Sequence, residues 1–117
     1  MKLICTLILL LLAHSQQDDF IFSHDNQKIT LKIDDGKRNL KWKEKSILNL
    51  KLENIDSQKM SLSAPGIMFR KTDKKNELDV EVTPTKEIFE RDSLNLFVSY
   101  KDQKDKFVSH KFSIAIK

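Results

Sequence analysis

Apolar and polar residues alternate in most segments between residues 27 and 117, which is the pattern of half-buried β-strands. The segments that this alternation predicts as strands are 27–34, 39–45, 46–54, 60–62, 67–69, 78–82, 93–100 and 107–117. Turn signals rich in Gly, Pro and Asp separate several of them, at residues 34–37, 64–66 and 102–105. Residues 84–91 follow a strand that stops at Pro84 and predict one or two turns of helix, with Ile88 and Phe89 pointing inward.

The spacing of these segments predicts an all-β fold. Seven or eight short strands at roughly 8–14 residue intervals are typical of a sandwich or small barrel. One apolar face per strand fits two antiparallel sheets packed on each other. A parallel α/β sheet needs long helical patterns between its strands, and the sequence has none. We therefore expect an antiparallel β-sandwich.

One stretch resembles a known family. After the short helical segment, Asp92-Ser93-Leu94-Asn95-Leu96-Phe97-Val98 resembles the corner before the penultimate strand of immunoglobulin-like domains. In that family a Tyr and a Cys usually take the inward positions that Leu96 and Val98 take here. Trp42 lies on an early predicted strand, but the cysteines that accompany such a tryptophan in the family are missing. The resemblance implies an immunoglobulin-like β-sandwich and no particular activity, because that fold hosts many unrelated functions.

The N-terminus has the three parts of a secretory signal peptide. Met1-Lys2 is a short basic start, residues 3–13 are apolar, and Ala13 and Ser15 are small residues at −3 and −1 of a cut before Gln16. The apolar run is shorter than the ~20 residues of a membrane-spanning helix. Ile4 precedes Cys5, where a lipoprotein signal would have a small residue. The sequence therefore predicts a signal peptide at 1–15, a flexible segment at 16–26 and the β-sandwich domain at 27–117, in a secreted or periplasmic protein with no transmembrane anchor after cleavage.

Cleavage would change the composition that matters for chemistry. Residues 16–117 carry 20 basic and 17 acidic side chains, a net charge of +3, and no cysteine. A disulfide-free domain of this length depends on its hydrophobic core alone. Because residues 16–117 have no cysteine, thiol catalysis and cysteine-ligated zinc are excluded for that segment. We expect no cofactor. Export argues against nucleic acid as a partner.

The histidines of the mature segment do not predict a catalytic site. Ser109 and His110 are sequence neighbours on a predicted strand, so their side chains point to opposite faces and cannot form a catalytic pair. His110 falls on the apolar face, as a core histidine does. His24, together with Asp18, Asp19 and Asp25, offers groups that zinc accepts as ligands, but polar residues at a chain terminus are typical of a solvated segment. We expect neither a metal site nor an enzyme.

The basic residues suggest a binding surface. Five of them lie close together around Trp42, namely Lys37, Arg38, Lys41, Lys43 and Lys45. On the predicted strand 39–45, alternate lysines share one face, which could meet phosphate, acidic polysaccharide or anionic lipid headgroups. Lysines on an exposed strand are also a routine protection against edge-to-edge aggregation, and this second interpretation is the more common one.

The sequence thus predicts a small module with a non-catalytic binding, structural or assembly role and an unknown protein or glycan partner. Its candidate surfaces are the basic strand and the loops at 64–66 and 70–76, which contribute Pro65, Arg70 and Lys71. One alternative is a secreted protease inhibitor that acts through an exposed loop such as Ser63–Gly66. A second alternative is a module that binds polyanions or glycans through the basic strand.

Overall fold

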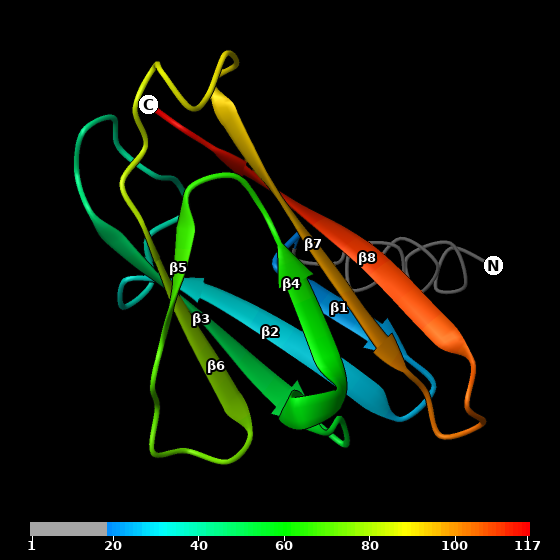
Figure 1. Cartoon of the computed structure of the whole chain (residues 1–117). Helices are drawn as coiled ribbons and strands as arrows, with labels where there is room; N and C mark the ends of the chain where they lie inside the picture. Colours follow the sequence, from blue (N-terminus) through cyan, green and yellow to red (C-terminus); the bar gives the residue numbers. More distant parts are fainter. Residues whose placement is uncertain (1–18) are drawn as a thin grey trace, which may run out of the picture.

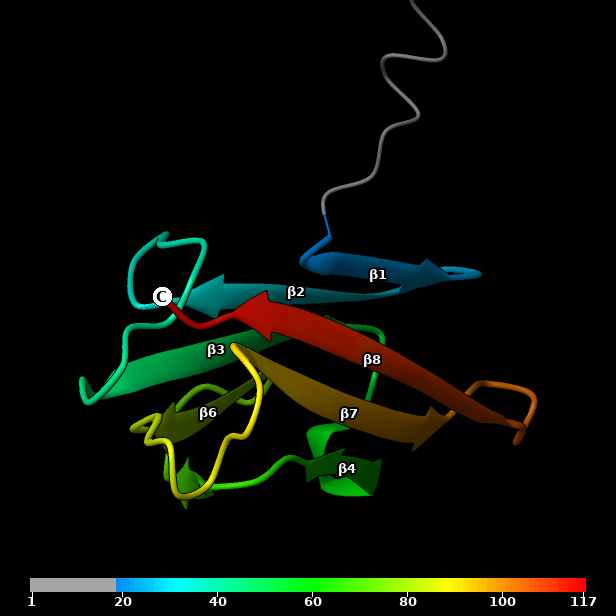
Figure 2. The ribbon, with the colours of Figure 1, turned by 90° about the horizontal axis from the view of Figure 1, so that it is seen from above.

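The computed structural model describes residues 19–117 and shows two β-sheets packed on each other (Figure 1). The strands are β1 (Ile21–His24), β2 (Gln27–Ile33), β3 (Ser46–Glu53), β4 (Met60–Ser63), β5 (Ile67–Arg70), β6 (Glu77–Val82), β7 (Ser93–Lys101) and β8 (Phe107–Ala115), with a short 3-10 helix η1 (Ser57–Lys59) before β4. One sheet has the order β1-β2-β3-β6-β5 and the other the order β4-β7-β8 (Figure 2). All neighbouring strands are antiparallel. The predicted signal peptide at 1–15 lies outside the described residues.

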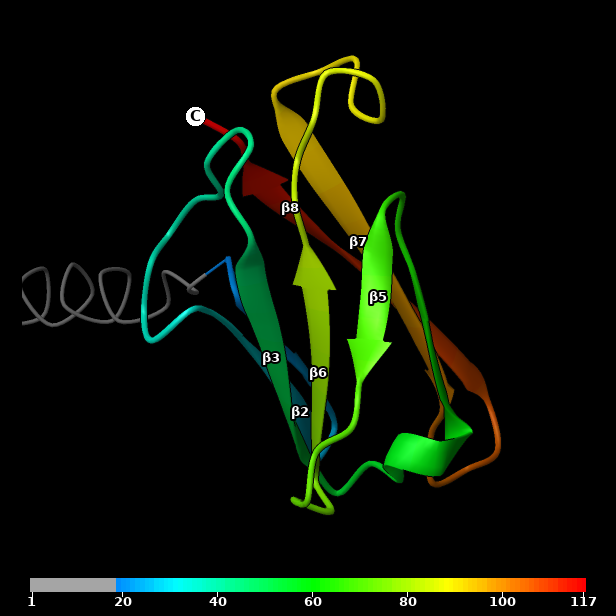
Figure 3. The same ribbon diagram turned by 60° about the vertical axis from the view of Figure 1, so that its left-hand side comes forward.

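The strand order is that of an immunoglobulin-like sandwich. In the constant-type arrangement, strands A, B, E and D form one sheet and strands C, F and G form the other. Here β2, β3, β6 and β5 follow the order A-B-E-D, and β4, β7 and β8 follow C-F-G. Figure 3 shows β5 at the edge of its sheet beside β6. The additional strand β1 lies next to β2. The predicted immunoglobulin-like β-sandwich is therefore confirmed.

The alternation along the strands builds the core between the sheets. Leu48 and Leu50 of β3 and Leu96 of β7 are fully buried. Leu96 and Val98 take the inward positions that hold Tyr and Cys in the family that the sequence resembles, and Val98 is buried as well. The two sheets are thus held together by aliphatic packing at the place where many immunoglobulin domains have a disulfide.

The domain begins earlier than residue 27. Ile21–His24, inside the segment predicted to be flexible, form β1 and pair with β2 through a hairpin, with His24 opposite Gln27. The backbone N–H of Leu31 also donates to the carbonyl oxygen of Phe20 at 2.8 Å, and the Phe20 side chain is buried. This hairpin stabilises the segment, which the pattern could not show because β1 is only four residues long and lies at an edge.

The predicted strand at 39–45 is wrong. Residues 34–45 form an irregular connection between β2 and β3, in which Leu40 makes a single parallel bridge to Ile116. The N–H of Leu40 donates to the carbonyl oxygen of Ala115 at 2.8 Å, so the connection crosses to the sheet that contains β8. Lys43 then has a φ of 66°, which an extended strand cannot accommodate. The lysines of this segment therefore do not form a row along one strand face.

Trp42 lies in this connection rather than on a strand. Its side chain is half-buried against the core, and the Lys86 ammonium lies 3.8 Å from the centre of the indole ring. Residues 84–91, predicted as helical, form turns instead, with the N–H groups of Ile88 and Phe89 both donating to the carbonyl oxygen of Thr85. Phe89 is buried as expected, whereas Ile88 is 46% exposed.

Candidate functional site

The outer face of the three-stranded sheet has an unusual composition. Its strands alternate, so every second residue points away from the core, and directly paired residues lie on the same face. The outward residues are Ser61 and Ser63 of β4, Ser93, Asn95, Phe97, Ser99 and Lys101 of β7, and Phe107, Ser109, Lys111, Ser113 and Ala115 of β8. Serine predominates, two phenylalanines are exposed and none of these residues is acidic. We call this surface the serine–phenylalanine face.

The centre of the serine–phenylalanine face is a shallow depression beside Phe97. Phe97 pairs with Ser63 on one side and Lys111 on the other, and its side chain is 52% exposed. Ser99 pairs with both Ser61 and Ser109, so a row of small hydroxyl side chains forms the floor next to the phenyl ring. The depression can accept an apolar group against the ring and hydrogen bonds from the hydroxyls.

The exposed apolar side chains of Phe107 and Ile88 extend the serine–phenylalanine face at its two ends. Phe107 is 75% exposed and lies opposite Lys101, whose ammonium is 5.3 Å from the ring centre. At the other end a second hollow is lined by Pro65, Ile88 and Phe97, together with the charged residues Glu90 and Arg91. Pro65 belongs to the turn between β4 and β5, so that turn forms an edge of the serine–phenylalanine face.

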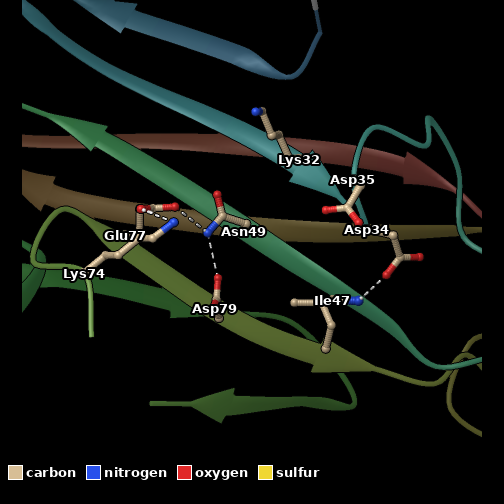
Figure 4. A pocket seen from close by; sticks show the side chains of 8 residues that line it. All are labelled: Lys32, Asp34, Asp35, Ile47, Asn49, Lys74, Glu77 and Asp79. Carbon is tan, nitrogen blue, oxygen red and sulfur yellow. Dashed lines mark hydrogen bonds and ion pairs between the residues drawn. The ribbon is translucent and has the colours of Figure 1, made fainter. Parts of the chain in front are cut away.

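The outer face of the five-stranded sheet is different, because it is charged and internally paired. Its hollow, shown in Figure 4, is lined by Lys32, Asp34, Asp35, Ile47, Asn49, Lys74, Glu77 and Asp79. The Asn49 amide donates to Asp79 at 2.7 Å and to Glu77 at 3.0 Å, and the Lys74 ammonium lies 3.6 Å from Glu77. These groups already have protein partners, so a ligand would have to displace them and desolvate several charges.

The structure does not bring the predicted site residues into one place. Lys37, Arg38, Lys41, Lys43 and Lys45 are all exposed in the β2–β3 connection, Pro65 lies in the β4–β5 turn, and Arg70 and Lys71 are at the end of β5. Some of them have local partners, since Lys37 lies 3.9 Å from Asp34 and Arg70 lies 3.5 Å from Glu81. The Arg38 guanidinium stacks 4.1 Å over the Phe20 ring. Only Pro65 adjoins the serine–phenylalanine face.

Sequence reasoning did not identify this face, although a signal for it exists. Once residues 93–100 are accepted as a strand, Phe97 occupies an outward position between polar neighbours. An outward phenylalanine at that position indicates an exposed apolar surface, and Phe107 repeats it on the next strand.

The two histidines have different surroundings. His110 stacks on Phe22 with 4.2 Å between ring centres and contacts the edge of Phe112, and burial lowers the pKa of its imidazole. Ser109 is exposed on the opposite face of β8, as expected. His110 is therefore a packing residue.

His24 faces two carboxylates. Its Nε2 lies 3.3 Å from Oδ2 of Asp102 and 3.5 Å from Oδ2 of Asp25. The backbone N–H of Lys106 is the main cause that holds the pKa of Asp102 below its usual range, against the effect of burial. The sequence had suggested Asp25 as a neighbour of His24. Asp102 was missed because it is far away along the chain, and Asp18 lies outside the described residues.

Comparisons with known proteins add one structural likeness. No family model and no curated protein matches the chain. Among solved structures, the chain is similar to the BIgI domain of beta protein from S. agalactiae, which was solved bound to CEACAM1. The two are 15% identical, the match covers 76% of this chain and 96% of that chain, and the TM-score is 0.43. The fold assignment rests on the strand order described above. Within residues 19–117, no helix is long and apolar enough to cross a membrane.

Proposed function

We propose that the protein is an exported, non-catalytic binding module that binds a protein partner through the serine–phenylalanine face. The observation that carries the proposal is the exposed Phe97 in the middle of a sheet face that has small polar side chains and no acidic residue. Export is supported by the signal-peptide pattern of residues 1–15.

The composition of this face lowers the cost of binding. Serine loses little side-chain entropy when it is buried, whereas long charged side chains lose the most. Few charges need to be desolvated, and exposed aromatic rings supply the apolar area that anchors an interface. Aromatic residues surrounded by Ser and Asn also characterise antibody binding sites, where the small residues provide adaptable hydrogen bonds.

The charges on the face indicate the chemistry of the partner. Lys101 and Lys111 are its only ionised side chains, and Lys101 has one exposed ion pair of 3.8 Å with Asp105. A partner surface with an apolar side chain for the Phe97 depression and carboxylates around it would be complementary. The face is therefore suited to an acidic protein surface rather than to a polyanion, because two lysines are too few for strong electrostatic binding.

A peptide-display experiment tests the binding surface. Peptides selected from a random display library on the immobilised protein should combine an aromatic or aliphatic residue with Asp or Glu. We expect their affinity to fall at least tenfold for Phe97→Ser and for Lys111→Glu. The matched control Lys32→Glu makes the same charge change on the outer face of the other sheet and should bind like the unmodified protein.

Two results of the display experiment would contradict the proposed binding surface. Equal binding to Lys111→Glu and Lys32→Glu, or undiminished binding to Phe97→Ser, would place the interaction elsewhere. Circular dichroism shows whether Phe97→Ser remains folded, and its half-exposed position makes this the expected result. Export is tested separately by mass spectrometry of protein recovered outside the cytoplasm, which should begin at Gln16; a chain that keeps Met1 would contradict cleavage.

A further inference from the structure

A cluster of three side chains lies where the β1–β2 turn of one sheet meets the β7–β8 turn of the other. His24 ends β1, Asp25 begins the β1–β2 turn, and Asp102 lies in the β7–β8 turn. Figures 1 and 2 both show these turns at the same end of the molecule. The donor atoms of the three residues all lie within 4.8 Å of one another. The structure assigns to His24, Asp25 and Asp102 a zinc-binding site that joins the two sheets.

The distances fit zinc. In tetrahedral coordination with bonds of about 2.0–2.2 Å, zinc holds its ligand atoms about 3.3–3.6 Å apart. His24 Nε2 is 3.3 Å from Asp102 Oδ2 and 3.5 Å from Asp25 Oδ2, so two edges of the tetrahedron are already formed. The third separation, between the two carboxylate oxygens, is within 4.8 Å, and Asp25 is the exposed member that can move.

Asp102 is held in position for this role. Its side chain is only 6% exposed, and its Oδ1 accepts the backbone N–H groups of Lys104 and Lys106, both at 2.9 Å. These two bonds fix the carboxylate within its own turn and leave Oδ2 directed at His24. Hydrogen bonds that orient a ligating carboxylate in this way are typical of metal sites.

A second observation points to a ligand at the same place. The hydroxyl of Tyr100 is buried and has no hydrogen-bond partner among residues 19–117. Tyr100 lies on the buried side of β7, two residues before Asp102, whose side chain is also buried. A buried hydroxyl without a partner is costly, whereas a metal-bound water as the fourth ligand would provide one.

Zinc is the cation that best matches these donors. One imidazole and two carboxylates form a set that zinc accepts, while calcium and magnesium favour more oxygen ligands and rarely use histidine. Two carboxylates also neutralise the charge of the divalent ion. The bound ion would connect the two turns in a sandwich whose residues 16–117 have no cysteine for a disulfide.

Calorimetry and thermal unfolding test the assignment. Purified, chelator-treated protein titrated with ZnCl2 should bind one ion, and zinc at 100 times its Kd should raise the unfolding midpoint by about 10 °C. Magnesium and calcium should cause no comparable shift. Asp102→Asn keeps an oxygen for the two backbone N–H groups but loses the anionic ligand, and it should weaken zinc binding at least tenfold.

Matched variants separate this site from the rest of the surface. Asp105→Asn changes an exposed carboxylate in the same turn and should leave the zinc affinity unchanged. Tyr100→Phe should weaken zinc binding while it keeps the ring in the core. If Asp102→Asn does not fold, His24→Gln replaces it, and Co²⁺ absorption reports whether a tetrahedral site with a nitrogen ligand persists.

Three results would overturn the assignment: no saturable binding of zinc, undiminished binding by both Asp102→Asn and His24→Gln, or a calcium response larger than the zinc response. The first would leave the cluster as the contacts of His24 with Asp25 and Asp102 alone. None of these results bears on the peptide-binding experiment, because Phe97 and Lys111, which that experiment changes, are not among the proposed zinc ligands.

Discussion

Substitution of Lys43 by glycine tests whether residues 39–45 form a strand, as the sequence predicts, or the irregular connection that the structure shows. Lys43 is exposed and has a φ of 66°, and its backbone N–H donates to the carbonyl oxygen of Pro84 at 2.8 Å. An L-residue in the left-handed region costs roughly 1–2 kcal/mol, which glycine avoids. Glycine loses about 0.5–1 kcal/mol more conformational entropy on folding than other residues. With the middle of each range, the net expectation for Lys43→Gly is a gain of about 0.5–1 kcal/mol.

Thermal and urea unfolding followed by circular dichroism measure this gain. For a domain of this size the midpoint should rise by about 2–8 °C. Lys41→Gly is the matched control, since Lys41 is also exposed but is not among the residues with positive φ. It should lose about 0.5–1 kcal/mol. If residues 39–45 were a strand, both substitutions would destabilise the protein. A lower midpoint for Lys43→Gly, equal to that for Lys41→Gly, would therefore refute the structural reasoning.

Three further predictions concern the core, the pH dependence and a turn. Leu96→Ala should lose about 2–5 kcal/mol in urea unfolding, while its exposed neighbour Asn95→Ala should stay within about 0.5 kcal/mol. Burial lowers the pKa of His110 in the folded protein. Below the ordinary histidine pKa of about 6.5 the unfolded chain therefore binds the proton more readily, and stability falls as the pH drops. The melting points of His110→Phe, measured over a pH series, should fall less than those of the unmodified protein, and an identical fall would contradict this. Asp34→Ala removes the acceptor of the Ile47 N–H bond of 2.9 Å and puts alanine at a φ of 41°, so it should cost at least about 1 kcal/mol in thermal unfolding; no change would contradict this.

Most of the sandwich could be predicted from the sequence because the buried strands alternate regularly. In β7 and β8, for example, Leu94 and Leu96 and then Phe112 and Ile114 mark the inner face directly. The segment 39–45 shows the limit of that reasoning. Leu40 is buried as a strand residue would be, but its partner is Ile116, and a pattern within one segment contains no information about such a distant pairing.

The candidate sites were harder to predict for the same reason. Phe97 is visible in the sequence as an outward aromatic residue, but the serines around it come from three strands and meet only through the register. His24 and Asp25 are neighbours in the chain, whereas Asp102 reaches them through the contact of two turns. Short-range patterns identify which residues face outward, and the topology decides which of them meet.

The bridge between Leu40 and Ile116 has a consequence for the order of events when the chain is made. Leu40 is fully buried, and its N–H and carbonyl groups are bonded to Ala115 and Lys117. Leu40 and Trp42 therefore lack these backbone partners until residues 115–117 have been synthesised. Until then the β2–β3 connection of a growing chain lacks its bonds to the segment that ends β8. The two sheets therefore gain this link, and Leu40 its buried position, only after β8 has been made.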